Sequence, residues 1–211
     1  FLVISPFSLA FTVISWKKLN DENAKRFYTK SITYLFFTVI FISLGISLFI
    51  PHFIKVFTLR TEYWQAAQYV PWVILSMPFY GIHFIGIFSF YVTKKTKYVF
   101  YSYLIALISK IIFDFVLIPK LGIFGAALVN FLSFLLLAVS IYLFSKKNYY
   151  FQYEWLKIFL MIAVYCICLL PFITINYESR LLEFILKILV FILFPFILYF
   201  CKFYEPIEIK N

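Results

Sequence analysis

The sequence predicts an all-α fold, a polytopic transmembrane helix bundle with about seven transmembrane helices. The first observation is composition: of 211 residues, 64% are hydrophobic and only 13% are charged, whereas soluble domains carry about 25% charged residues. The second is a series of apolar runs of membrane-spanning length, and the third is an alternation of basic residues between the connecting loops. Together they exclude a soluble globular domain, because too few polar residues are present to cover its core.

Seven apolar runs supply the predicted spans. A helix needs about 20 residues to cross the hydrocarbon core, and an open sheet cannot satisfy its backbone in lipid. The runs are Phe1–Trp16, Ser31–Ile50, residues 70–92, Tyr98–Ile118, Phe124–Phe144, Ile158–Ile175 and Phe184–Cys201. We expect the first to be the tail of a truncated span, the second to stop at Pro51, and Pro71 and Pro78 to kink the third.

The loops between these runs alternate in charge. Thirteen of the 19 Lys and Arg residues lie in residues 17–30, 94–97, 146–157 and the C-terminal tail, and four lie in the intervening loops. By the positive-inside rule, the richer set of loops and the C-terminus are cytoplasmic. Two lysines fall inside spans, Lys110 near a span centre and Lys187 near the outer end of the last span, where we expect its side chain to snorkel to the interface.

Nucleic-acid and metal sites are not expected. The net charge is +10, but the basic residues are scattered in short clusters and form no stripe typical of a nucleic-acid binder. Cys166, Cys168 and Cys201 lie in apolar runs and match no metal-ligand spacing, so we interpret them as buried thiols.

Small residues follow the turn Pro119-Lys120-Leu121-Gly122. Gly122, Ala126, Asn130 and Ser133 are spaced by four, four and three residues, which predicts one helix face. Small residues let helix backbones approach closely in lipid. We therefore interpret Gly122, Gly125, Ala126 and Ala127 as a helix-packing motif, and Asn130 either as part of that contact or as a substrate ligand.

Ile118–Ala127, with the sequence IPKLGIFGAA, resembles the IP-x-x-G-I-x-G-A-A turn of polysaccharide flippases. These are the Wzx-type O-antigen and capsule unit translocases of the multidrug/oligosaccharidyl-lipid/polysaccharide exporter superfamily. The resemblance implies a MATE-like transporter of two six-helix bundles that rock around a central cavity, often followed by two extra helices. On this basis residues 1–145 are the later helices of the second bundle, and residues 146–211 are the additional C-terminal pair with a cytoplasmic tail.

The resemblance also implies a function. The chain, as the C-terminal part of a longer protein, would be a flippase or exporter in the bacterial inner (plasma) membrane, working with the missing N-terminal half. It would move a polyprenyl-pyrophosphate-linked oligosaccharide across the bilayer by alternating access during polysaccharide biosynthesis, including that of lipopolysaccharide O-antigen. No cofactor is expected, and ion or proton coupling stays open.

Polar residues inside the spans are the candidate substrate-cavity residues. A lysine near mid-membrane costs at least about 2.5–3.5 kcal/mol, so Lys110 is expected to face a partner or a cavity. Asp114 lies one helical turn on, and the pair is either a structural ion pair or part of a cationic cavity for an anionic substrate. His83 is either hydrogen-bonded to a neighbouring helix or a protonatable coupling site.

Three other functions compete with this interpretation. A drug/cation antiporter of the same superfamily is disfavoured by Lys110. A membrane-embedded polyprenyl-linked glycosyltransferase or polysaccharide polymerase is disfavoured because the outer loops are short and no HExxH, GxSxG or P-loop motif is present. A flippase for a lipid-linked peptidoglycan precursor is the nearest relative of the favoured function. We therefore expect a transporter and not an enzyme.

Overall fold

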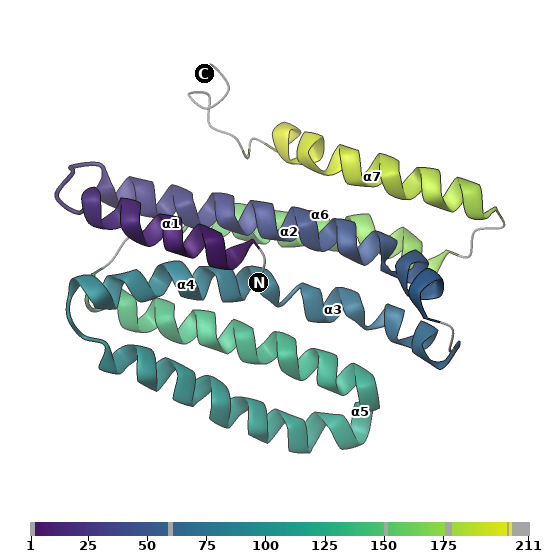
Figure 1. Ribbon diagram of the computed structural model, residues 1–211, viewed down its shortest axis with the longest axis horizontal. Coiled ribbons are helices and arrows are strands. Elements are labelled where there is room, and N and C mark those ends of the chain that lie inside the picture. Colours follow the sequence, from purple (N-terminus) through teal and green to yellow (C-terminus); the bar gives the residue numbers. More distant parts are fainter. Residues whose placement is uncertain (1–2, 59–60, 150–151, 176–178, 202, 204–211) are drawn as a thin grey trace. The chain divides into compact units, whose positions relative to one another are not determined.

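The computed structural model describes residues 3–58, 61–149, 152–175, 179–201 and 203, and every element in these ranges is helical (Figure 1). The chain forms two compact units, Phe1–Val39 with Trp72–Glu154 and Ile40–Pro71 with Trp155–Asn211. The all-helical prediction is therefore confirmed. Four residues used in the span and charge predictions, Phe1, Arg60, Lys202 and Lys210, lie outside the described ranges.

The first unit contains helices α1 (Ile4–Lys17), α4 (Met77–Val92) and α5 (Lys97–Lys146), with the N-terminal part of α2 (Ala24–Phe57). Aromatic rings fill its core. The Phe88 ring of α4 lies 5.7 Å from Phe11, 5.4 Å from Trp16 and 5.3 Å from Tyr28. Edge-to-face and tilted pairs of this kind add to the stabilisation from apolar burial, so they fix α1 and α2 against α4.

Helix α5 is a helical hairpin. Figure 1 shows α5 running outward and then back alongside itself, and the reversal lies at Gly122, whose φ of 58° and ψ of −132° are not helical. Residues with a Cβ rarely adopt a positive φ, so glycine is the residue suited to this position. The two spans predicted on either side of residues 119–122 are confirmed as the two halves of α5.

The second unit contains the C-terminal part of α2, the 3₁₀ helix η1 (Thr61–Gln68), α6 (Trp155–Thr174) and α7 (Arg180–Phe200). The Phe191 ring of α7 stacks on Phe41 of α2 with centroids 4.4 Å apart. The hydroxyls of Tyr165 on α6 and Ser47 on α2 are hydrogen-bonded at 2.8 Å. These contacts fasten both C-terminal helices to α2.

Five helices in the described ranges are long and apolar enough to cross a membrane: α2, residues 70–92, α5, α6 and α7. Because α5 reverses at Gly122, they supply six crossing segments. Helix α1 has only 14 residues, or about 21 Å of helix, which is shorter than the roughly 20 residues that cross the hydrocarbon core.

The prolines within the predicted spans differ in whether they interrupt a helix. Residues 70–92 are divided at Leu75 and Ser76 into α3 (Val70–Ile74) and α4, which confirms the kink predicted at Pro78. Pro71 lies in the first turn of α3 and marks no break. The prediction that Pro51 ends its span is wrong, because α2 continues through Pro51 to Phe57. Membrane helices tolerate proline where neighbouring groups compensate for the lost hydrogen bond.

Two predictions about individual side chains are corrected. Lys187 does not snorkel, because it is only 3% exposed and its ammonium donates to Glu183 Oε1 at 2.5 Å. Its Nζ also lies 5.7 Å from the centre of the Phe172 ring on α6, so an ion pair and an aromatic face replace solvent. Of the three cysteines, only Cys168 is buried; Cys166 on α6 and Cys201, directly after α7, are exposed.

Candidate functional site

Lys110 and Asp114 lie in the first half of α5. The Lys110 ammonium is 3.6 Å from Asp114 Oδ2, and the two side chains are 47% and 35% exposed. The residues around them on this half-helix, including Leu107, Ile111 and Phe115, are exposed and apolar. The pair is therefore a charged spot on an otherwise apolar exposed surface.

His83 is fully buried within the first unit. Its ring stacks on Tyr80 at 5.6 Å and meets the edge of Tyr103, from α5, at 4.9 Å. Neither ring nitrogen has a hydrogen-bond partner among the residues that the structure describes. The predicted alternative of a histidine hydrogen-bonded to a neighbouring helix therefore does not describe this arrangement. Buried polar groups without partners are uncommon in native proteins and call for an explanation, so His83 stays a candidate for a transport role.

Asn130 joins the second half of α5 to the break between α3 and α4. Its side-chain amide donates to Ser76 Oγ at 3.0 Å, and Ser76 Oγ in turn donates to the carbonyl of Val73 at 2.5 Å. Hydrogen bonds between membrane helices contribute about 0.6–2 kcal/mol each. In this structure Asn130 has the geometry of a helix–helix contact at the break between α3 and α4.

The three candidate positions lie at two levels along the helices. Tyr103, the partner of His83, precedes Lys110 by seven residues, and Ser76, the partner of Asn130, precedes His83 by seven. Seven residues of helix rise about 10.5 Å. Both steps lead away from the turn between α4 and α5, because α4 and the first half of α5 run antiparallel. Lys110 and the Asn130–Ser76 contact therefore lie at about the same level, and His83 lies about 10.5 Å closer to the turn.

The small residues after the turn divide between two faces. Gly125 and Ala127 are buried, whereas Ala126 is exposed. A Cβ built on Gly125 would lie 2.5 Å from the Leu117 carbonyl oxygen, so the close approach is between the two halves of α5 itself. Of the predicted face, Asn130 contacts Ser76 and Ser133 is buried, whereas Ala126 is exposed. Gly122 does not belong to the face, because it lies in the turn and is not helical.

A polar cluster that the sequence did not reveal lies at the start of α2. Glu154 accepts hydrogen bonds from Lys30 Nζ at 3.1 Å and from Thr33 Oγ1 at 2.5 Å. Thr29 Oγ1 donates to the carbonyl of Gln152 at 2.6 Å. More than 120 residues separate the partners in sequence, so no local pattern could indicate the contact. The cluster holds the segment that precedes α6 against α2.

A known family matches part of the sequence. The sequence model of the MatE family matches residues 7–116, which cover α1 to the first half of α5. A comparison with curated proteins finds no match. The aromatic cluster around Phe88 and the exposed surface around Lys110 fall inside the matched region, whereas the second half of α5 lies outside it.

A solved structure shares the fold. It is that of "Lipid II flippase MurJ, inward closed conformation", with a TM-score of 0.66 and 22% sequence identity, over 96% of this chain. The same alignment covers 45% of that protein. The chain thus spans just under half the length of the flippase that it resembles, and at this level of identity the likeness establishes the fold alone.

Proposed function

The chain belongs to the MatE family, and from this we propose that it is part of a flippase that moves a polyprenyl-pyrophosphate-linked oligosaccharide across a bacterial inner membrane. The observation that carries the proposal is the likeness of 96% of the chain to a protein named as a lipid II flippase. The proposed mechanism is alternating access, in which two bundles rock around a cavity. Transporters built from repeats bind their substrates between the halves, near the middle of the membrane.

The turn Ile118–Ala127 supports a Wzx-type substrate, the repeat unit of a surface polysaccharide. It combines Pro119, the positive-φ Gly122 and the close backbone approach at Gly125, the elements by which the sequence resembles polysaccharide flippases. A second candidate substrate is lipid II, for which the structurally similar flippase is named. Both substrates are anionic lipids with a sugar headgroup, so one electrostatic site would suit either.

Lys110 is our candidate for the residue that attracts this anionic group. A lysine exposed to lipid near the middle of a span would be costly, and its surface is open on this chain. A water-lined cavity facing the other bundle removes that cost. Water would also screen the ion pair with Asp114, which leaves part of the positive charge of Lys110 available to the substrate.

We expect Lys110→Met in the full-length transporter to lower export of surface polysaccharide about tenfold or more, because a hydrogen bond to a charged group is worth about 1.5–3 kcal/mol. Protein level should stay the same, and Lys110→Arg should keep most of the activity. The measurement is cell-surface polysaccharide together with the lipid-linked precursor that accumulates inside. Accumulation of lipid II in its place would indicate the second candidate substrate.

The double variant Lys110→Met with Asp114→Leu separates this role from a structural ion pair. If the pair only stabilises α5, removing both charges should restore export. If Lys110 attracts the substrate, the double variant should be present in the membrane and still fail to export. Restored export would therefore overturn the role assigned to Lys110.

The proposed orientation places the turn between α4 and α5 in the cytoplasm, together with the C-terminus. Lys94, Lys95 and Lys97 lie at this turn, and the positive-inside rule favours the cytoplasm for such a cluster. A cysteine introduced as Lys95→Cys should resist a membrane-impermeant thiol reagent in intact cells and react after the cells are opened. Equal labelling before and after opening would contradict the orientation.

A further inference from the structure

The imidazole of His83 lies in a cage of aromatic rings. It is fully buried, stacks on Tyr80 of its own helix, and meets the edges of Phe84 at 5.5 Å and of Tyr103 at 4.9 Å. Neither ring nitrogen has a hydrogen-bond partner among the described residues, and burying polar atoms without partners is unfavourable. A phenylalanine would fill the same cage without this cost. Packing alone therefore does not account for a histidine at this position.

No charged side chain lies against the ring among the contacts that the structure describes. The titratable groups that face it are the phenols of Tyr80 on α4 and Tyr103 on α5. On the side of α2, Tyr28 meets Phe88 at 5.3 Å, and Phe88 lies five residues, or about 7.5 Å of helix, beyond His83. An imidazolium in this cage would be a buried charge without a counter-ion, which is strongly unfavourable. This packing therefore fits the neutral ring.

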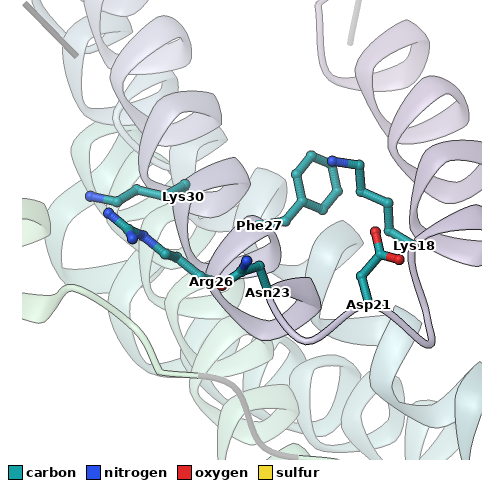
Figure 2. Close-up of a pocket in the computed structure, with 6 residues that line it drawn as sticks. All are labelled: Lys18, Asp21, Asn23, Arg26, Phe27 and Lys30. Atoms are coloured by element: carbon teal, nitrogen blue, oxygen red, sulfur yellow. The ribbon is translucent and has the colours of Figure 1, made fainter. Parts of the chain in front are cut away.

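The charged side chains at the turn between α1 and α2 lie farther along the first unit (Figure 2). They include Lys18, Asp21, Arg26 and Lys30. All of these but Lys30 precede Tyr28 in the sequence, so they lie at about the level of Phe88 or beyond it. Lys30 is paired with Glu154 at 3.1 Å. In the part of the chain that the structure describes, these side chains therefore supply no counter-charge for the imidazole.

Tyr103 separates the imidazole from an exposed surface. It is 45% exposed, although one edge of its ring lies against His83. Lys110 follows seven residues later, nearly two full turns of helix, so Tyr103 and Lys110 lie on one face of α5, with the exposed Leu107 between them. A change in the side-chain torsion of Tyr103 would therefore open His83 to the surface that carries Lys110.

We propose that His83 is a proton-binding site of the transporter, closed by Tyr103 in this structure and opened to the surface around Lys110 when the Tyr103 side chain moves aside. The proposal rests on the proposed function, in which that surface faces a water-lined cavity. Water would deliver the proton to a ring nitrogen and solvate the resulting imidazolium. A ligand shifts a protein toward the state that binds it, so acid would favour the open arrangement. The added positive charge would then strengthen the attraction of Lys110 for an anionic substrate.

Exchange of the imidazole Cε1 hydrogen for deuterium tests this site directly. The exchange proceeds through the protonated ring and needs contact with water, so it reports proton binding and access for one histidine at a time. It is followed by mass spectrometry of peptides from purified full-length transporter, in detergent near neutral pH. His52, the other histidine of this chain, is only partly buried and serves as the reference in each sample. We expect exchange at His83 to be measurable but slower than at His52.

Tyr103→Ala should raise the exchange rate at His83 about tenfold, because the aromatic pair that closes the site is lost. Tyr101→Ala is the matched control. It removes the same ring from the same half-helix, and both tyrosines are 45% exposed, but the described ring contacts of Tyr101 are with Tyr98 and Phe100. In this control the exchange rate at His83 should stay within about twofold of the unmodified protein. Size-exclusion chromatography first establishes that each variant is folded.

Coupling to transport is measured in proteoliposomes, with undecaprenyl pyrophosphate linked to a fluorescent sugar as the probe. An exposed imidazole takes up a proton near about pH 6.5, so lowering the pH from about 8 to about 5.5 should favour the open arrangement about tenfold. The translocation rate of the unmodified protein should change accordingly. His83→Phe should abolish this pH dependence, and His52→Phe should keep it.

The exchange rates and the transport assay contradict different parts of the proposal. No exchange at His83 where His52 exchanges, or equal acceleration by Tyr101→Ala and Tyr103→Ala, would overturn the site. A pH dependence that survives in His83→Phe would overturn its coupling to transport. If the unmodified protein translocates no probe, the proposed function fails, and the exchange rates still decide whether His83 binds a proton.

Discussion

Replacing Glu183 by glutamine is expected to destabilise the helical unit formed by the end of α2, α6 and α7 by about 3 kcal/mol, a typical cost of leaving a buried charge without its partner. Lys187 is 3% exposed and its ammonium lies 2.5 Å from Glu183. Without the carboxylate, the Lys187 ammonium would lose its ion pair. Among the contacts of the described residues, the face of the Phe172 ring, 5.7 Å away, would then be its one remaining favourable electrostatic contact. The melting temperature of the purified full-length transporter measures the loss.

Removing Lys187 and removing Glu183 should lower the stability by different amounts. Lys187→Met leaves Glu183, whose side chain is 28% exposed, and a partly solvated carboxylate is less costly than a buried ammonium. We therefore expect Lys187→Met to lower the melting temperature less than Glu183→Gln. The double variant Glu183→Gln with Lys187→Met should recover most of the loss, because no uncompensated charge remains.

The pair Lys110–Asp114 provides a matched control with the same four-residue spacing. The Lys110 ammonium lies 3.6 Å from Asp114 Oδ2, and the two side chains are 47% and 35% exposed. Exposed ion pairs at this helical spacing contribute about 0.3–0.5 kcal/mol to stability. Asp114→Asn should therefore change the melting temperature little. A loss as large as that of Glu183→Gln would show that Lys110 is sealed from water, which would contradict the cavity proposed for it.

The spans could be predicted because the apolar runs and their interruptions are local features of the sequence. Each predicted span corresponds to a helix or to half of a helical hairpin, and Pro119 with Gly122 marked the reversal of α5. The end of α2 was missed because proline removes one hydrogen bond without forcing a membrane helix to stop. Whether a proline ends a span depends on its neighbours, and these are not visible in a local sequence.

Side-chain environments were less predictable, because they depend on which helix faces which. Lys187 near a helix end fits a snorkelling residue, but the structure packs it against Phe172 of α6. The contact between Lys30 and Glu154 joins residues 124 positions apart. Similarly, the four-residue count from Gly122 to Ala126 fails because Gly122 is not helical, with φ at 58°. A face must be counted from the first residue after the turn.

The last prediction concerns Gly125, where the two halves of α5 meet. A Cβ at this position would lie 2.5 Å from the carbonyl oxygen of Leu117, 2.8 Å from its carbonyl carbon and 3.2 Å from the Cα of Ile118. These are backbone atoms, which cannot rotate away as a side chain can. Overpacking a tight site costs about 1–3 kcal/mol, occasionally more. We expect the destabilisation by Gly125→Ala to lie at the upper end of this range, because the clash can be relieved only if the two halves of α5 move apart.

Two variants test whether backbone proximity is the cause. Ala126→Leu adds a larger group at the next residue, which is exposed, and should leave the folded yield nearly unchanged. Gly45→Ala would meet the Phe191 ring at 2.9 Å, a side chain that can shift, and should cost less than Gly125→Ala. The measurement is the monodisperse fraction of full-length transporter in size-exclusion chromatography. If Gly125→Ala is tolerated as well as Ala126→Leu, the tight hairpin does not depend on a glycine at this position.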